Sequence, residues 1–216
     1  GFFACVKSGM VQEAVKTTAA NRLRDVSSRK EVLLGTNQFP NFTEKAGSKV
    51  QSPESKSAHA GGCSCASVGL ETLEPVRGAK EFEALRFATE NSGKAPKAFM
   101  LTIGNLAMRL ARAQFSGNFF ACAGYEIIDN LGFATVEEGV EAALGANADV
   151  VVLCSSDDEY AQFAPQAYEL LKNKALLAVA GAPANMEELK AKGIEHFIHV
   201  RSNVLETLQE FNDKLI

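Results

Sequence analysis

Short apolar runs alternate with amphipathic stretches in the second half of the chain. From residue 98 onward, five apolar runs of strand length are each followed by a segment whose apolar residues recur at helical spacing. The apolar runs are 98–102, 125–128, 150–154, 175–180 and 196–200, and the amphipathic segments are 105–123, 136–144, 158–171, 186–192 and 204–215. Repeats of this kind, joined by short turns, predict a five-stranded parallel sheet covered by helices on both faces.

Such an arrangement is an α/β fold of the flavodoxin-like, doubly wound class. Its ligand crevice lies at the carboxyl ends of the strands, where the turns lead into the helices. The turns are therefore the places to look for functional side chains.

The first half of the chain has a different pattern. Residues 6–24 place apolar side chains at helical spacing, and residues 31–34 predict a short buried strand closed by Gly35. A helix followed by a strand is half of a βαβ unit, so we expect the remnant of a larger domain here.

The expected domain organisation follows from these patterns. A stretch rich in Ser, Gly and Ala has the composition of a flexible linker, and a charged helical pattern follows it. We predict a domain remnant at 1–46, a linker at 47–76, a connecting helix at 77–95 and the flavodoxin-like domain at 96–216.

Composition narrows the class of protein. The 216 residues are 46% hydrophobic and 22% charged, with a net charge of −4, so no broad cationic surface for nucleic acid is expected. No apolar run approaches the ~20 residues of a membrane span, and no signal peptide is apparent. Five cysteines, an odd number, favour reduced thiols over a disulfide framework. We expect a cytoplasmic protein without a membrane or nucleic-acid partner.

The turn after the first strand of the expected sheet, TIGNLAMR, is the first candidate site. Gly104 and Asn105 precede a helix whose free amides could receive an anion, with Arg109 and Arg112 one turn further along. Phosphate sites normally carry several glycines, which this turn lacks. Arginines that face solvent or a partner are the favoured interpretation, and a nucleotide or acyl-CoA bound at this helix N-terminus is the alternative.

Two further turns are explained by helix capping. In VVVLCSSDDEY, Ser156 and Glu159 have the spacing of a capping box, with Asp157 and Asp158 expected in the first helical turn, where the dipole favours acids. In AVAGAPANMEELK, Asn185 is expected to cap the next helix. Neither turn predicts a catalytic group.

The three histidines do not form an evident metal or catalytic site. His196 and His199 are three apart on a predicted strand and point to opposite faces. His59, Cys63 and Cys65 have an H-x3-C-x-C spacing, but no clear fourth zinc ligand accompanies them. We therefore assign no catalytic and no metal-binding residue.

Several long segments carry a family resemblance. GNLAMRLARAQFSGNFFACAGYEIIDNLGF, VVVLCSSDDEY and AVAGAPANMEELKAKGIEHFIHV resemble the C-terminal domain of the small, or beta, subunit of bacterial methylmalonyl-CoA mutase. RGAKEFEALR is similar to the segment before that domain, and SRKEVLLGTNQFPN is similar to the end of the family's TIM-barrel domain. The resemblance implies that residues 1–46 are the remnant of a TIM barrel.

The resemblance also implies a function. The family is a heterodimeric isomerase of propionate metabolism that interconverts methylmalonyl-CoA and succinyl-CoA by adenosylcobalamin radical chemistry. The large subunit is expected to bind the cobalamin through D-x-H-x-x-G in its first crevice loop, where the His ligates cobalt and the Asp orients that His.

This chain departs from the cobalamin motif. Counted forward from the strand, the Asp, His and Gly positions hold Leu106, Met108 and Ala111; counted back from FFACAGYEI, they hold Ala107, Arg109 and Arg112. Neither register supplies an acid, an imidazole or a glycine, so we expect no cofactor in this chain and adenosylcobalamin in the partner large subunit. A third hypothesis is that the chain is itself a cobalamin carrier, but the missing His argues against it.

The expected function is therefore noncatalytic. We expect a portion of a small subunit that acts through folding and through association with the large subunit. Arg109 and Arg112 are expected to meet an acidic surface of the partner or of the barrel.

Overall fold

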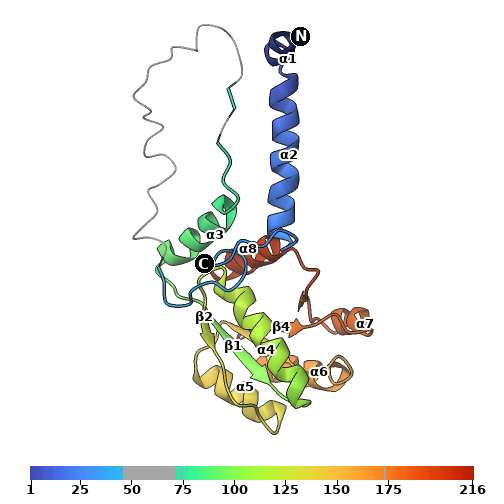
Figure 1. Cartoon of the computed structure of the whole chain (residues 1–216). Coiled ribbons are helices and arrows are strands. Elements are labelled where there is room, and N and C mark those ends of the chain that lie inside the picture. The colour runs from blue at the N-terminus through green and yellow to red at the C-terminus, as the bar shows by residue number, and fades with distance from the viewer. Residues whose placement is uncertain (46–71, 74, 173) are drawn as a thin grey trace.

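The computed structural model describes residues 1–45, 72–73, 75–172 and 174–216. It contains a sheet of five strands, which lies in the lower half of the view in Figure 1. The strand order is β2-β1-β3-β4-β5, and all neighbouring strands are parallel. The strands are β1 (Lys97–Thr102), β2 (Glu126–Ile128), β3 (Val150–Cys154), β4 (Leu176–Ala180) and β5 (His196–Ile198). This is the flavodoxin-like order, and the predicted fold class is confirmed.

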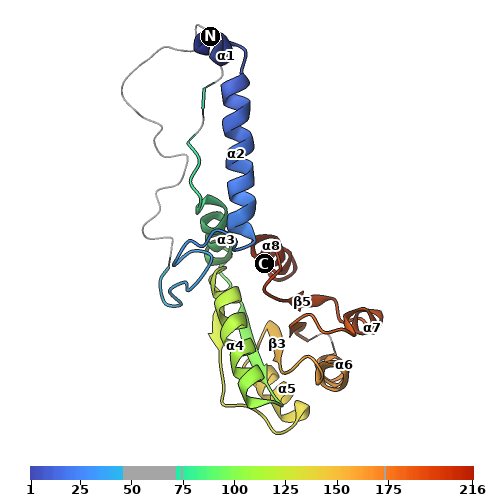
Figure 2. The ribbon, with the colours of Figure 1, turned by 45° about the vertical axis from the view of Figure 1, so that its right-hand side comes forward.

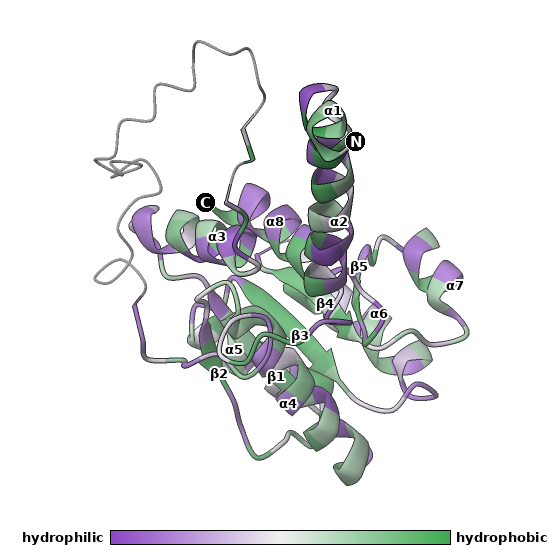
Figure 3. Ribbon diagram, turned by 45° about the horizontal axis from the view of Figure 1, so that its top comes forward, coloured by the Kyte–Doolittle hydropathy of each residue, from purple (hydrophilic) through white to green (hydrophobic). Residues whose placement is uncertain are grey.

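Burial explains why these residues form strands. Every residue of β3, at the centre of the sheet, is buried, and its register places Val151 beside Phe99 on one side and Leu177 on the other. A strand covered on both faces reads as a continuous apolar run, as the hydrophobic colour of the central strands in Figure 3 shows. The edge strands β2 and β5 have three residues each and are shorter than the apolar runs predicted.

Helices cover both faces of the sheet. One face packs against α3 (Lys80–Asn91), α4 (Leu106–Ala121) and α8 (Val204–Leu215) around Met100 and Val152. The other face packs against α5 (Val136–Gly145), α6 (Tyr160–Leu171) and α7 (Met186–Ala191) around Leu101 and Leu153. Alternate residues of β1 and β3 thus point into separate cores.

The N-terminal helix predicted over 6–24 is divided in two. Helix α1 (Phe2–Lys7) ends before Gly9, whose φ of 79° breaks the helical path, and α2 (Met10–Ser27) follows. In Figures 1 and 2, α1 and most of α2 extend away from the sheet, while the end of α2 lies beside α8. Val26, near that end, is buried in the same core cluster as α8.

The prediction of a strand at 31–34 was wrong. Only an isolated bridge joins Leu34 to Gln38, because the buried Asn37 side chain binds the backbone groups of this segment. Its amide donates to the carbonyls of Val26 and Glu31 at 2.8 and 2.9 Å, and its oxygen accepts from the Leu33 N–H at 2.8 Å. The segment therefore turns around Asn37 instead of pairing with a strand.

The domain boundaries at residues 46, 76 and 95 remain predictions, as does the TIM-barrel remnant. Most of the predicted linker lies outside the described residues. Helix α3 is present within the expected connecting helix.

Candidate functional site

The crevice at the carboxyl ends of the strands begins with the turn between β1 and α4. Gly104 has φ 76°, and Asn105 caps α4 by accepting the N–H of Met108 at 3.1 Å. One of the free amides of the helix N-terminus is thus satisfied by the chain itself.

Glu159 connects this turn with the turn after β3. Its carboxylate accepts the backbone N–H groups of Asn105 and Ser156, each at 3.2 Å, and the Ser156 hydroxyl at 2.7 Å. The Ser155 hydroxyl also donates to it. These hydroxyl and amide donors, Ser155 first, lower the pKa of Glu159 to about 2. The N-terminus of α4 therefore already has a negative charge beside it.

Close packing at Gly104 depends on the absence of a side chain. A Cβ there would lie 2.3 Å from the Glu159 carboxylate. Together with the positive φ, this distance explains why glycine precedes Asn105.

The capping predictions were only partly correct. Glu159 does reach back to the Ser156 N–H, but α6 begins at Tyr160, and the Ser156 hydroxyl donates to the carboxylate instead of capping the helix. Asp157 and Asp158 lie in the turn before α6 and not in its first turn. Asn185 stands at the start of α7 but makes no side-chain capping hydrogen bond.

Arg109 joins the first turn to the loop between β2 and α5. Its guanidinium donates to the carbonyls of Gly104 at 3.4 Å and Leu131 at 3.2 Å. Gly132, with φ 114°, gives it room, since a Cβ there would lie 2.6 Å from Arg109 Cζ. The buried Nε of Arg109 has no hydrogen-bond partner among the residues described.

Arg112 joins α4 to the turn after β3. It forms an ion pair with Asp157 at 2.9 Å, and its side chain is 21% exposed. Both side chains lie against Gly181 in the turn after β4, where a Cβ would be 2.8 Å from Asp157 and 3.4 Å from Arg112. Both arginines thus contact their own chain, and their contact with an acidic partner surface remains a prediction.

In one of the two registers of the cobalamin motif, the His and Gly positions hold Arg109 and Arg112, which lie on α4. Their guanidinium groups contact the carbonyls of Gly104 and Leu131 and the carboxylate of Asp157 in the surrounding turns. Within the described ranges, no group of three or more His, Cys, Asp or Glu could hold a metal ion.

The two described histidines have different surroundings. The His196 ring packs against the Phe211 ring at a centroid distance of 4.8 Å and a tilt of 44°, and its Nε2 lies 3.0 Å from Lys214 Nζ. The Nδ1 of His199 accepts the N–H of Arg201 at 3.2 Å. Burial, followed by nearby cations, lowers the pKa of both imidazoles. The proposed grouping of His59, Cys63 and Cys65 lies outside the described residues.

Two of the described cysteines are buried. Cys122 directly follows α4, and Cys154 is the last residue of β3. Burial raises the pKa of Cys122 and raises that of Cys154 to about 12, so neither is a ready nucleophile.

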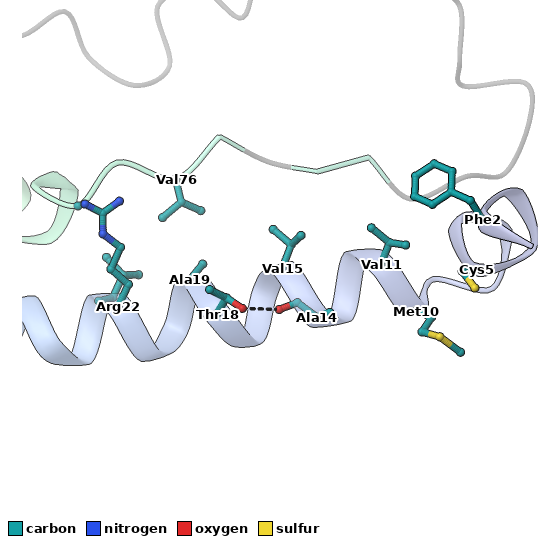
Figure 4. A pocket seen from close by; sticks show the side chains of 12 residues that line it. Phe2, Cys5, Met10, Val11, Ala14, Val15, Thr18, Ala19, Arg22 and Val76 are labelled. Carbon is teal, nitrogen blue, oxygen red and sulfur yellow. Dashed lines mark hydrogen bonds between the residues drawn. The ribbon is translucent and has the colours of Figure 1, made fainter.

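A groove of about 670 Å³ runs along α2, facing the segment around Val76 (Figure 4). Apolar side chains such as Phe2, Val11 and Val15 line it. Arg22, at one end, is bound to Glu31 at 2.6 Å. The described residues of the groove thus offer mainly apolar surface, with one ion pair at its end. None of the helices described is both long and apolar enough to span a membrane.

The fold and the crevice define the class of this protein: a flavodoxin-like α/β domain whose ligand crevice is occupied by its own side chains. No protein-family model matches the chain. It is 58% identical over 214 residues to a methylmalonyl-CoA mutase small subunit of Porphyromonas gingivalis, covering 99% of this chain and 34% of that protein.

More distant relatives have the same name. The small subunit of Streptomyces virginiae is 30% identical over 203 residues, covering 90% of this chain and 31% of the relative. A probable small subunit of Mycobacterium bovis is 30% identical over 149 residues, which cover 66% of this chain and 21% of the relative. The chain is therefore homologous to methylmalonyl-CoA mutase small subunits, as its sequence indicated, and spans about a third or less of the length of these relatives.

The sequence reasoning missed the part played by Glu159. Its partner Asn105 is 54 residues away in the chain, and only the juxtaposition of β1 and β3 brings the two turns together. The local signal, a Ser and a Glu three residues apart, was present but predicted a local cap.

Proposed function

We propose that this chain is part of a methylmalonyl-CoA mutase small subunit and that it acts by folding and by associating with the large subunit. In this proposal the cytoplasmic heterodimer interconverts methylmalonyl-CoA and succinyl-CoA, and the large subunit holds adenosylcobalamin. The present chain supplies no catalytic residue to that reaction.

The filled crevice is the observation that carries the noncatalytic role. Arg109 donates to the carbonyls of Gly104 and Leu131 and so joins the turns after β1 and β2. Arg112 binds Asp157 in the turn after β3, and both side chains lie against the turn after β4. Glu159 joins the turns after β1 and β3, so side chains of this chain connect all four turns. Removing two packed cations to admit a ligand would leave Asp157 without its partner. The name shared by the relatives supports the choice of enzyme.

The alternative function is binding of a nucleotide or an acyl-CoA at the N-terminus of α4. Glu159 disfavours it, because a carboxylate beside the Asn105 N–H repels a phosphate that would approach the same amide. We therefore give preference to the subunit role.

A cobalamin titration followed by visible spectroscopy tests the noncatalytic role. The chain is titrated alone and in complex with the large subunit, and the large subunit alone is the positive control. We expect a bound-cobalamin spectrum only where the large subunit is present. Stoichiometric binding by the isolated chain would contradict the proposal.

Association is tested separately by co-purification of the tagged large subunit with this chain at increasing salt. We expect a stable complex. Free CoA and ADP are titrated in parallel, with Glu159→Gln as the matched variant, since loss of the negative charge would strengthen binding of a phosphate at α4. Tight binding of either ligand, together with no complex, would favour the alternative function.

A further inference from the structure

The segment after α2 contacts α4 and the residue that follows it at a small number of positions. We define the strap as residues 29–39, which run from the end of α2 across α4. The strap begins at Arg29, whose φ of 59° is rare for a residue with a side chain. A non-glycine residue keeps this conformation only when the surrounding contacts hold it there.

Arg29 supplies those contacts. Its guanidinium carbon lies 5.8 Å from the ring centre of Phe115 and 5.5 Å from that of Phe119, both on α4. Its Nε donates to the Asn37 carbonyl at 2.6 Å, and one terminal nitrogen lies 3.5 Å from the Cys122 sulfur.

The inside of the strap is organised by Asn37, which is fully buried. Its side chain binds the backbone of Val26, Glu31 and Leu33, so the fold of the strap is continuous with the end of α2. Leu33 packs against the core cluster that contains Val26.

The far end of the strap is attached independently. The Phe39 N–H donates to the Asn118 side chain on α4 at 3.0 Å, although Phe39 itself is 55% exposed. The strap is therefore fixed at Arg29 and at Phe39, with the Asn37 network between them.

We propose that the strap is a cooperative docking unit that holds α2 on the sheet domain and that opens as a unit, exposing the end of α4, while the sheet stays folded. We expect the strap to open before the sheet because the two are held by different kinds of contact. Its attachments to α4 are the side-chain contacts of Arg29 and one hydrogen bond from the Phe39 N–H to the Asn118 side chain. In contrast, β3 is held by backbone pairing on both sides and by two cores. Segments held by few contacts open at lower free energy than central strands. This inference does not depend on the proposed function.

Two cysteines allow the opening to be measured. Cys122 lies beneath Arg29, whereas Cys154 lies in the central strand and is fully buried. In a Cys5→Ser, Cys63→Ser, Cys65→Ser background, alkylation by N-ethylmaleimide is followed at each thiol by peptide mass spectrometry. We expect Cys122 to react about tenfold faster than Cys154 or more, since its exposure requires only local opening.

Variants assign the opening to the strap. Arg29→Ala is expected to raise the alkylation rate of Cys122 by about tenfold or more and to leave Cys154 unchanged, because hydrogen bonds of a charged donor are lost. Arg29→Gly removes the same side chain and tolerates the positive φ, so it should change the alkylation rates of Cys122 and Cys154 as Arg29→Ala does. Arg24→Ala, whose side chain contacts Asn21 on the same helix at 3.4 Å, is the matched control and should change neither rate.

Asn118→Ala removes the acceptor of the Phe39 N–H, which is the second attachment of the strap to α4. This variant tests the proposal if the Arg29 variants do not fold. Faster alkylation of Cys122 alone supports the strap. Equal rates at Cys122 and Cys154, or a Cys122 rate that responds to none of the folded variants, would overturn it.

Discussion

The carboxylate of Glu159 accepts the backbone N–H of Asn105 at 3.2 Å and so joins two turns of the crevice that are 54 residues apart in the chain. The same carboxylate accepts from Ser155 and Ser156. A single acid thus holds the start of α4 against the turn that leads to α6.

Glu159→Gln should lower the free energy of unfolding by about 1–2 kcal/mol, because the amide retains one acceptor but loses the charge that strengthens these bonds. Urea unfolding at pH 7 measures the change. Glu188→Gln, at an exposed position of α7, is the matched control and should change stability by less than about 0.5 kcal/mol. Equal effects of the two variants would contradict the role given to Glu159.

The contribution of Glu159 should depend on pH in a defined direction. Its pKa is lowered in the folded state from 4.5 to about 2, so its stabilisation is fully present above pH 4.5 and is lost as the pH falls toward 2. The difference in unfolding free energy between the wild-type chain and Glu159→Gln should therefore shrink over that range. A difference that stays constant down to pH 2.5 would place the pKa elsewhere.

Gly132→Ala should destabilise the chain by about 1–3 kcal/mol, because it forces a side chain into a left-handed conformation. A Cβ at this position would also lie 2.6 Å from the Arg109 guanidinium. Gly145→Ala, at the end of α5 with nothing within 4 Å of its Cβ, is the control and should be neutral or stabilising by up to about 1 kcal/mol. Thermal unfolding by circular dichroism compares the two. An unaffected Gly132→Ala variant would show that the β2–α5 loop does not hold Arg109 as described.

Tyr125→Phe should cost about 1–3 kcal/mol, since it leaves a buried acceptor without its donor. The Tyr125 hydroxyl donates to the Asn212 side chain at 2.8 Å, and Asn212 in turn donates to Thr89 at 2.8 Å, which links the turn between α4 and β2 to α8 and α3. Tyr168→Phe removes a hydroxyl from a half-buried tyrosine of α6 and is the matched control, with little expected loss. Similar losses in both variants would argue against the network.

His196 should make the chain less stable at mildly acidic pH. Burial against Phe211, then the neighbouring Lys214, lowers its pKa below 6.5, so the unfolded chain takes up the proton first. Stability is full above pH 6.5, falls as the pH drops below it, and levels off once the folded state is also protonated. The acids Glu195 and Glu210 oppose this shift without reversing it.

The matching variant is His196→Gln, compared by urea unfolding at pH 7.5, 6.5 and 5.5. We expect a flatter dependence of stability on pH than in the wild-type chain, with the rest of the slope due to His199, whose pKa is also lowered. An unchanged slope would show that His196 is not the group that titrates.

Much of the fold could be predicted because it is encoded locally. The runs that became β3 and β4 are apolar throughout, and the run that became β1 is apolar except at Thr102, since each is buried on both faces. Asn105 was placed correctly before α4. The strand predicted at 31–34 did not form, because Asn37, three residues after it, decides the path of a segment whose apolar residues resemble a strand.

The candidate site was less predictable for the same physical reason. Arg109 and Arg112 were recognised as residues of the crevice, but their partners Leu131 and Asp157 lie on other turns. A charged side chain at a turn has many possible partners, and the sequence does not rank them. The bridging role of Glu159 was hidden by the local capping pattern that it also satisfies in part.

The sequence by itself determined the flavodoxin-like class, the approximate helices and strands of residues 96–216, and the family to which the chain is homologous, because periodicity and long matching segments are local properties. Only the tertiary structure decided what occupies the crevice and how the N-terminal helix is attached. Those outcomes depend on pairs such as Glu159 with Asn105 and Arg29 with Phe119, which meet only after the parallel strands have aligned their ends and α4 has packed on the sheet.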